Sequence, residues 1–154
     1  MLDSFLPARI DNSYRGHRIA LWLFGAVVLV KLAIALASIF NGYEAASSAD
    51  GIPLASYPPA AARAVVTLFA LLGLLHLVIG FVCLLVLIRY RALIPFTFAI
   101  LIAEYIGRRL ILFVLPIEET GAGSRGLVIN LVILAAMVVG LVLSLRARAG
   151  SAAR

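Results

Sequence analysis

The sequence predicts an all-α integral membrane protein, an antiparallel bundle of four transmembrane helices with both termini in the cytoplasm. Three observations lead to this fold class. The 154 residues are 64% hydrophobic and 13% charged, whereas soluble domains are about 45–50% apolar and about 25% charged. The apolar residues gather in four runs, each near the ~20 residues that a helix needs to cross a bilayer. Arginines cluster at alternate ends of these runs, a pattern that orients membrane proteins.

The basic charge of the chain does not predict nucleic-acid binding, despite a net charge of +6 and a pI near 10.3. The arginines stand singly or in pairs at the ends of apolar runs, with no basic stripe or aromatic platform. Cys83 is the single cysteine and lies inside an apolar run, which excludes an intramolecular disulfide and a cysteine-based metal cage. We expect it to be a packing residue, and we expect no cofactor and no metal.

The first predicted span covers residues 18–40, with Trp22 near its start, where an amphipathic ring suits the membrane interface. Residues 1–17 are too polar to span, but their apolar side chains have near-helical spacing, which predicts a short helix on the headgroups. A cleaved signal peptide is the alternative, because residues 35–37 read Ala-Leu-Ala. The acidic residues of the leader and Lys31 in the apolar run oppose that alternative.

Residues 41–61 are predicted to be an outer loop, since glycine, serine and proline punctuate them. The second span is expected at 62–88, directly after a proline pair that suits a helix start. Residues 89–92 form a very short basic turn on the cytoplasmic side, so the second and third spans should be antiparallel neighbours.

The third span is expected at 93–115 and the fourth at 127–145, with a second outer loop at 116–126 between them. Pro95 falls in the first turn of the third span, where proline is tolerated, and Pro116 ends it. All 154 residues are thus assigned to a single membrane domain.

Arginine distribution orients the chain, because positively charged segments stay in the cytoplasm. The N-terminal segment, the 89–92 turn and the C-terminal tail hold eight arginines, whereas the outer loops offer only Arg63 and Arg125, at helix starts. The acidic residues of the loops then face outward: Glu44, Asp50, Glu118 and Glu119. We expect a multi-pass protein of the cell membrane, whose layout resembles that of many small bacterial inner-membrane proteins.

Each predicted span carries a strong polar group in the middle or outer half of the membrane. Charges at this depth cost roughly 2.5–3.5 kcal/mol each on insertion scales, so they usually face protein or water rather than lipid. They define the candidate site, a polar intramembrane cluster of Lys31, His76, Glu104, Arg108, Arg109 and Asn130.

Glu104 has two expected partners. Arg108 lies four residues further along the same helix, and Lys31 lies at a similar depth on the first span. The simplest interpretation is a buried ion pair that fixes helix register and adds little net stability. The alternative is a proton- or cation-linked carboxylate of a transporter, with His76 as a proton shuttle beside it.

Small residues mark the faces on which the helices should meet. His76 shares its face with Gly73 and Gly80, so a neighbouring backbone can come close to it. Asn130 shares a seam of the fourth span with Gly140, and we expect its amide to hydrogen-bond to another helix.

A purely structural role explains Arg108 and Arg109 less well than the other polar residues, because two adjacent arginines cannot share one partner face. Tyr105 and Arg109 form a second stripe beside that of Glu104. Arg109 could extend to the outer headgroups, and Glu118 or Glu119 of the second outer loop could fold back to meet either arginine. The remaining candidate partner is an anionic lipid headgroup or a small anion.

Enzymatic activity is not expected. No two carboxylates share a span, and the sequence has no HExxH motif and no glycine-rich loop followed by a phosphate-binding lysine. We expect a non-enzymatic helix bundle, either an accessory or scaffolding subunit or a lipid- or anion-binding protein. A small proton- or ion-coupled transporter acting as a homo-oligomer is the alternative. The expected partners are the lipid bilayer, the anion at the two arginines, and another membrane protein or a second copy of the chain.

Two families of small four-span proteins do not fit. Small multidrug-resistance transporters carry an acidic residue in the first span, where this chain has Lys31. The quinone-linked disulfide-forming enzymes require cysteine pairs, and this chain has one cysteine.

Overall fold

The computed structural model describes residues 11–14, 16–117 and 124–146, and all regular structure within these ranges is helical, with no strand. The predicted all-helical class is therefore confirmed. Four long helices make up most of the described chain: α2 (Arg18–Phe40), α4 (Pro59–Arg89), α5 (Ile94–Val114) and α6 (Ser124–Leu145). Four short elements join them: α3 (Gly42–Glu44), the π-helix η1 (Ala45–Ala49), and the 3₁₀-helices η2 (Leu54–Ser56) and η3 (Arg91–Leu93).

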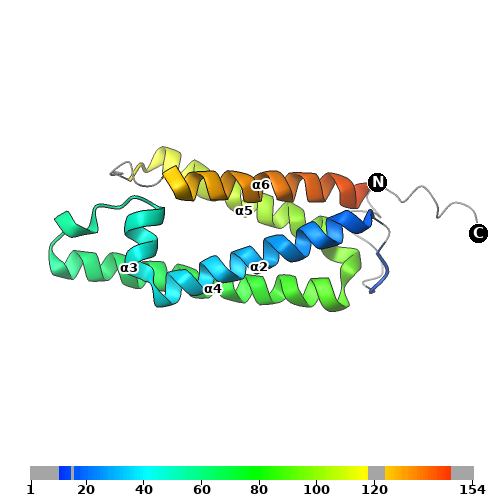
Figure 1. Cartoon of the computed structure of the whole chain (residues 1–154), viewed down its shortest axis with the longest axis horizontal. Coiled ribbons are helices and arrows are strands. Elements are labelled where there is room, and N and C mark those ends of the chain that lie inside the picture. Colours follow the sequence, from blue (N-terminus) through cyan, green and yellow to red (C-terminus); the bar gives the residue numbers. More distant parts are fainter. Residues whose placement is uncertain (1–10, 15, 118–123, 147–154) are drawn as a thin grey trace, which may run out of the picture.

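The long helices lie side by side, with α2 at the centre (Figure 1). α2 packs along both α4 and α6, and α5 packs along α6. The short connection through η3 predicts close packing of α4 against α5, yet their mutual contacts are few and α4 packs mainly against α2.

Two glycines explain why α4 prefers α2. A Cβ atom on Gly73 would lie 2.9 Å from the carbonyl oxygen of Ala35, and one on Gly80 would overlap the side chain of Leu32. Because hydrogen replaces the side chain at both positions, the backbones of α2 and α4 approach closely, as expected from this small-residue face.

At one end of the protein lie the start of α2, the end of α4, the start of α5 and the end of α6 (Figure 1). The N–H of His17 donates to the carbonyl oxygen of Leu143 at 3.1 Å, which ties α2 to α6 there. The His17 ring caps α2 by accepting from the N–H of Ile19 at 3.3 Å. Nearby, burial raises the pKa of Tyr14 to about 12.

The helix bounds are close to the expected ones. α2 covers the residues predicted from hydropathy, whereas α4 begins at Pro59 rather than at residue 62. Proline is tolerated in the first turn of a helix because its missing N–H has no intrahelical partner there. The alanines after Pro59 therefore extend the helix toward the loop.

Residues 41–58 are more ordered than the predicted irregular loop. They contain α3, η1 and η2, and they form a small core of their own. Its buried members are Ala46, Ile52 and Leu54, covered by Val66 and Phe69 of α4 and by other apolar neighbours. The sequence marks the turns correctly but misses these short helices.

The main apolar core lies toward the end where α2 begins. Phe24 of α2 and Phe98 of α5 meet edge to face, with ring centroids 5.0 Å apart. Val28, Leu101 and Met137 are buried around them, and Cys83 belongs to the same core, as its packing role predicts. Mainly apolar packing fills this half of the protein.

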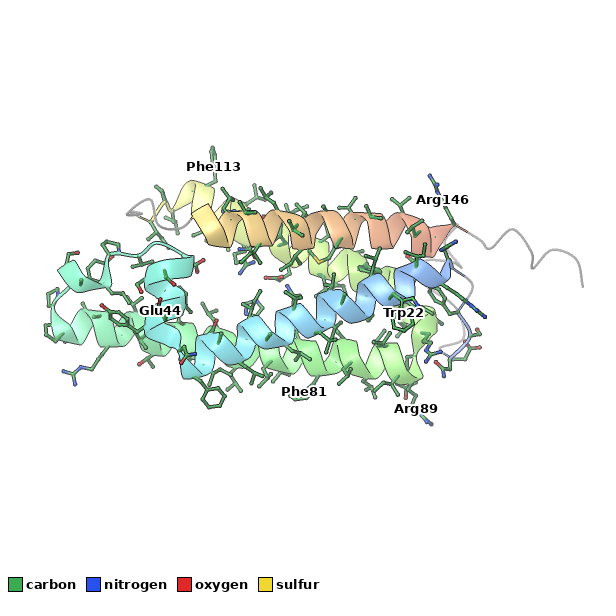
Figure 2. The ribbon with its side chains drawn as sticks, in the orientation of Figure 1. Trp22, Glu44, Phe81, Arg89, Phe113 and Arg146 are labelled. Carbon is green, nitrogen blue, oxygen red and sulfur yellow. The ribbon has the colours of Figure 1, made fainter. Side chains whose placement is uncertain are left out.

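Three helices are long and apolar enough to cross a membrane: α2, α4 and the Gly126–Leu145 part of α6. Many of their large apolar side chains face outward. Trp22 is 82% exposed and Phe81 is 58% exposed, and Phe81 lies at the outer edge of α4 in Figure 2. Arg89 and Arg146 lie toward one end and Glu44 toward the other (Figure 2). Such a surface suits lipid, because water would disfavour contiguous apolar area of this extent. Of the short helix predicted for residues 1–17, residues 1–10 and 15 lie outside the described residues, and residues 11–14, 16 and 17 are not helical.

Candidate functional site

Three long helices bring ionisable side chains to the same level. Lys31 follows the start of α2 by thirteen residues, His76 precedes the end of α4 by thirteen, and Glu104 follows the start of α5 by ten. At a rise of ~1.5 Å per residue, all three lie about 15–20 Å from the end that these helices share. That level is just beyond the apolar core.

The carboxylate of Glu104 is the centre of the cluster. Its Oε2 accepts a hydrogen bond from Nζ of Lys31 at 3.0 Å. Its Oε1 faces Nε2 of His76 at 3.3 Å, and Nε of Arg108 lies 3.8 Å from the same Oε1. The last distance allows electrostatic attraction but is too long for a hydrogen bond. One acid thus serves basic groups from three helices, including both expected partners.

His76 makes a second polar contact on its own helix. Its Nδ1 lies 2.9 Å from the carbonyl oxygen of Leu72, which also fixes the direction of the ring. Because a carbonyl oxygen can only accept, Nδ1 carries a proton and donates it. The ring is therefore held between α4 and α5, where Nε2 meets Glu104.

Tyr105 lies between the two arginines. Nε of Arg109 donates to its hydroxyl oxygen at 3.3 Å, and the guanidinium carbons of Arg108 and Arg109 lie 5.9 and 5.8 Å from its ring centre. Both distances permit cation–π attraction. The prediction that adjacent arginines cannot share a partner face is wrong, because one aromatic ring serves both. Their spacing from Tyr105 indicated the contact with Arg109, but not the shared ring.

The cluster has more positive than negative charge. Glu104 is the only acidic residue in the sequence of the four long helices, and it faces the cations Lys31 and Arg108. The partner of Arg109 among the described residues is the neutral Tyr105. Three positive charges thus face one negative charge, which leaves the cluster with a net charge of +2 among the described residues. The side chain of Arg108 is 44% exposed and is the most accessible member.

The remaining predicted residues are not part of this cluster. Asn130 is half-buried on α6, and no hydrogen bond joins it to any other helix among the described residues. The expectation of an interhelical bond is therefore not met. Glu118 and Glu119, proposed to fold back onto the arginines, lie outside the described residues.

The described residues do not bring three or more histidine, cysteine, aspartate or glutamate side chains together in a group that could hold a metal ion. Glu104 and His76 are one such pair, and the third neighbour is the cation Lys31. A cation would be repelled from this position by the surrounding positive charge. An anion would be attracted.

Compared with protein-family models, with curated proteins and with solved structures, the chain shows no match. The geometry and charge of the cluster are therefore the basis for its functional assignment.

Proposed function

We propose that this protein is a non-enzymatic membrane protein with four spans, which binds an anionic group at Arg108 and Arg109. The group is the head of an acidic lipid or a small anion of similar chemistry, such as a phosphate or sulfate. The observation that carries the proposal is the charge of the cluster: among the described residues, Lys31, Arg108 and Arg109 are balanced by Glu104 alone. Guanidinium groups bind such oxyanions with paired hydrogen bonds.

α5 is the fourth span in this proposal. Its 21 residues correspond to about 30 Å of helix, which matches the hydrocarbon thickness of a bilayer. Its central charges are the reason that hydropathy alone does not select it. Lys31 and His76 cover Glu104 from the neighbouring helices, so the carboxylate is shielded from lipid.

In this proposal the protein lies in a bacterial inner membrane, and both of its termini face the cytoplasm. The support is the predicted arginine bias together with the fold. Arg89 and Arg146 lie toward the end where α2 begins, and Glu44 lies toward the other (Figure 2). In that orientation Arg108 and Arg109 lie in the outer half of the membrane and would meet an anion from the outer side.

A purely scaffolding role accounts for less of the site. It explains the contacts among Lys31, His76 and Glu104, which can fix helix register. It does not explain why the chain has a second arginine, Arg109, at membrane depth beside a neutral tyrosine, or why Arg108 is 44% exposed there. Such residues inside a membrane generally mark functional sites.

A small proton-coupled transporter acting as a homo-oligomer is the second candidate. The observation that favours it is the direct contact between two titratable side chains, His76 and Glu104, each about a quarter exposed. Loss of proton-coupled uptake in a folded Glu104→Gln variant would support this candidate.

Anion binding at the arginines is tested with a double substitution, Arg108→Gln with Arg109→Gln. We expect binding to weaken by about tenfold or more, since a hydrogen bond to a charged group contributes about 1.5–3 kcal/mol. Sulfate binding is measured by calorimetry in detergent, and retention of phosphatidylglycerol by native mass spectrometry. The two probes distinguish a soluble anion from a lipid headgroup.

The matched control is Arg89→Gln with Arg91→Gln, a basic pair at the other end of the helices. We expect this control to bind like the unmodified protein. Equal affinity of both double variants for both probes would refute the proposed site.

A further inference from the structure

Both ring nitrogens of His76 face oxygen acceptors. Nδ1 lies 2.9 Å from the carbonyl oxygen of Leu72, and Nε2 lies 3.3 Å from Oε1 of Glu104. A neutral imidazole has one donor and one acceptor nitrogen. In either neutral tautomer, one ring nitrogen would therefore direct its lone pair at an oxygen lone pair. The doubly protonated imidazolium donates at both contacts.

The groups around the ring place this extra proton on His76 rather than on Glu104. Lys31 of α2 donates to Oε2 of Glu104 at 3.0 Å, an interaction that favours the ionised carboxylate. Arg108 on α5 adds a further positive charge 3.8 Å from Oε1. α6 has no charged residue between Gly126 and Leu145. Within the part of the chain that the structure describes, Glu104 is thus the one anion facing the imidazolium.

His76 and Arg108 approach the same oxygen. With Nε2 protonated, Oε1 is occupied at 3.3 Å and Nε of Arg108 stays at 3.8 Å, beyond hydrogen-bond distance. Loss of the Nε2 proton to solvent would replace this attraction by lone-pair repulsion. Oε1 would then move toward Arg108 and form a hydrogen bond with its guanidinium.

We infer that protonation of His76 controls anion binding at Arg108 and Arg109. The imidazolium holds Oε1 of Glu104, adds one positive charge to the cluster and leaves the Arg108 guanidinium to the anion. The neutral ring releases Oε1, and the carboxylate then competes with the anion for Arg108. The inference rests on the proposed function, because it describes the regulation of the same site.

The expected result is anion affinity that rises as the pH falls. Coupling between two ligands of one protein is typically fivefold or more, and it is reciprocal. We therefore expect sulfate affinity to increase by at least about fivefold on going from about pH 8 to pH 5, the range in which histidine changes charge. Sulfate and phosphatidylglycerol keep a constant charge over this range, so the probes themselves contribute no pH dependence.

The test compares the unmodified protein with His76→Gln and with His17→Gln. His17 is the other histidine of the chain and lies at the start of α2, away from the cluster. We expect the His76 variant to bind sulfate equally at both pH values, and the His17 variant to keep the full pH dependence. Pronounced pH dependence that survives in His76→Gln would overturn the inference.

The two proposals fail in different ways. Binding that is present but independent of pH in the unmodified protein would overturn the inference and leave the anion site in place. Absence of binding at every pH would refute the anion site and, with it, the control of that site by His76. Nitrogen-15 NMR on the unmodified protein tests the protonation directly and does not depend on a folded variant. At pH 5 both ring nitrogens of His76 should show the chemical shifts of protonated nitrogens. One protonated and one unprotonated nitrogen at this pH would contradict the geometry.

Discussion

Replacing Glu104 by glutamine is expected to lower the free energy of unfolding by about 2 kcal/mol. Removing one partner of a fully buried ion pair generally costs about 3–5 kcal/mol, because the other charge is left without compensation. The side chain of Glu104 is 25% exposed, so solvent or headgroups would screen part of this effect. The loss is measured by equilibrium unfolding in detergent.

A double-mutant cycle shows whether that loss arises at Lys31. The variants are Glu104→Gln, Lys31→Met and their combination. Since Nζ and Oε2 lie 3.0 Å apart, we expect the double variant to be less destabilised than the sum of the single effects, by about 1 kcal/mol. Strictly additive effects would contradict a direct interaction between the two side chains.

Replacing Gly140 by alanine is expected to destabilise the protein by about 1–3 kcal/mol. A Cβ atom at this position of α6 would overlap the ring of Phe98 on α5. Phe98 is fully buried and also packs against Phe24, so its ring has little room to move. Overpacking of a filled core typically has an effect of this size. Thermal unfolding in detergent measures the change.

Gly107→Ala is the matched control, because a Cβ atom there would have no heavy atom within 4 Å apart from its chain neighbours and the backbone of its own helix. Gly107 also lies in the middle of a long helix, where alanine is favoured over glycine by up to about 1 kcal/mol. We therefore expect this variant to be neutral or slightly more stable. A similar loss of stability in both variants would show that the close contact of Gly140 with Phe98 does not cause the destabilisation by Gly140→Ala.

Hydropathy located the helices well because of one physical constraint. In lipid, every backbone N–H and C=O must be bonded within the segment, so an apolar run of spanning length has little choice but to be a helix. This is why α2 has the bounds read from the sequence. The same signal says nothing of lateral packing, and the preference of α4 for α2 over α5 arises from close backbone approach at Gly73 and Gly80.

The sequence predicted those contacts of the site that depend on the spacing of residues along a helix and on their depth in the membrane. The contacts of Glu104 with Lys31 and with Arg108 follow from these two quantities. The shared role of Tyr105 does not, because long arginine side chains have several rotatable bonds and spacing cannot fix where their guanidinium groups end. Asn130 was expected to bond across helices, but its depth does not specify an acceptor within reach.

The central claim is that α5 crosses the membrane with its charges, and the locations of the two termini test it most directly. Four spans place both ends of the chain on the same side, whereas three spans place them on opposite sides. The measurement uses fusions of green fluorescent protein and of alkaline phosphatase at Met1 and at Arg154. We expect fluorescence and no phosphatase activity at both ends. Phosphatase activity at Arg154, with Met1 still in the cytoplasm, would show that α5 does not cross and would contradict the account.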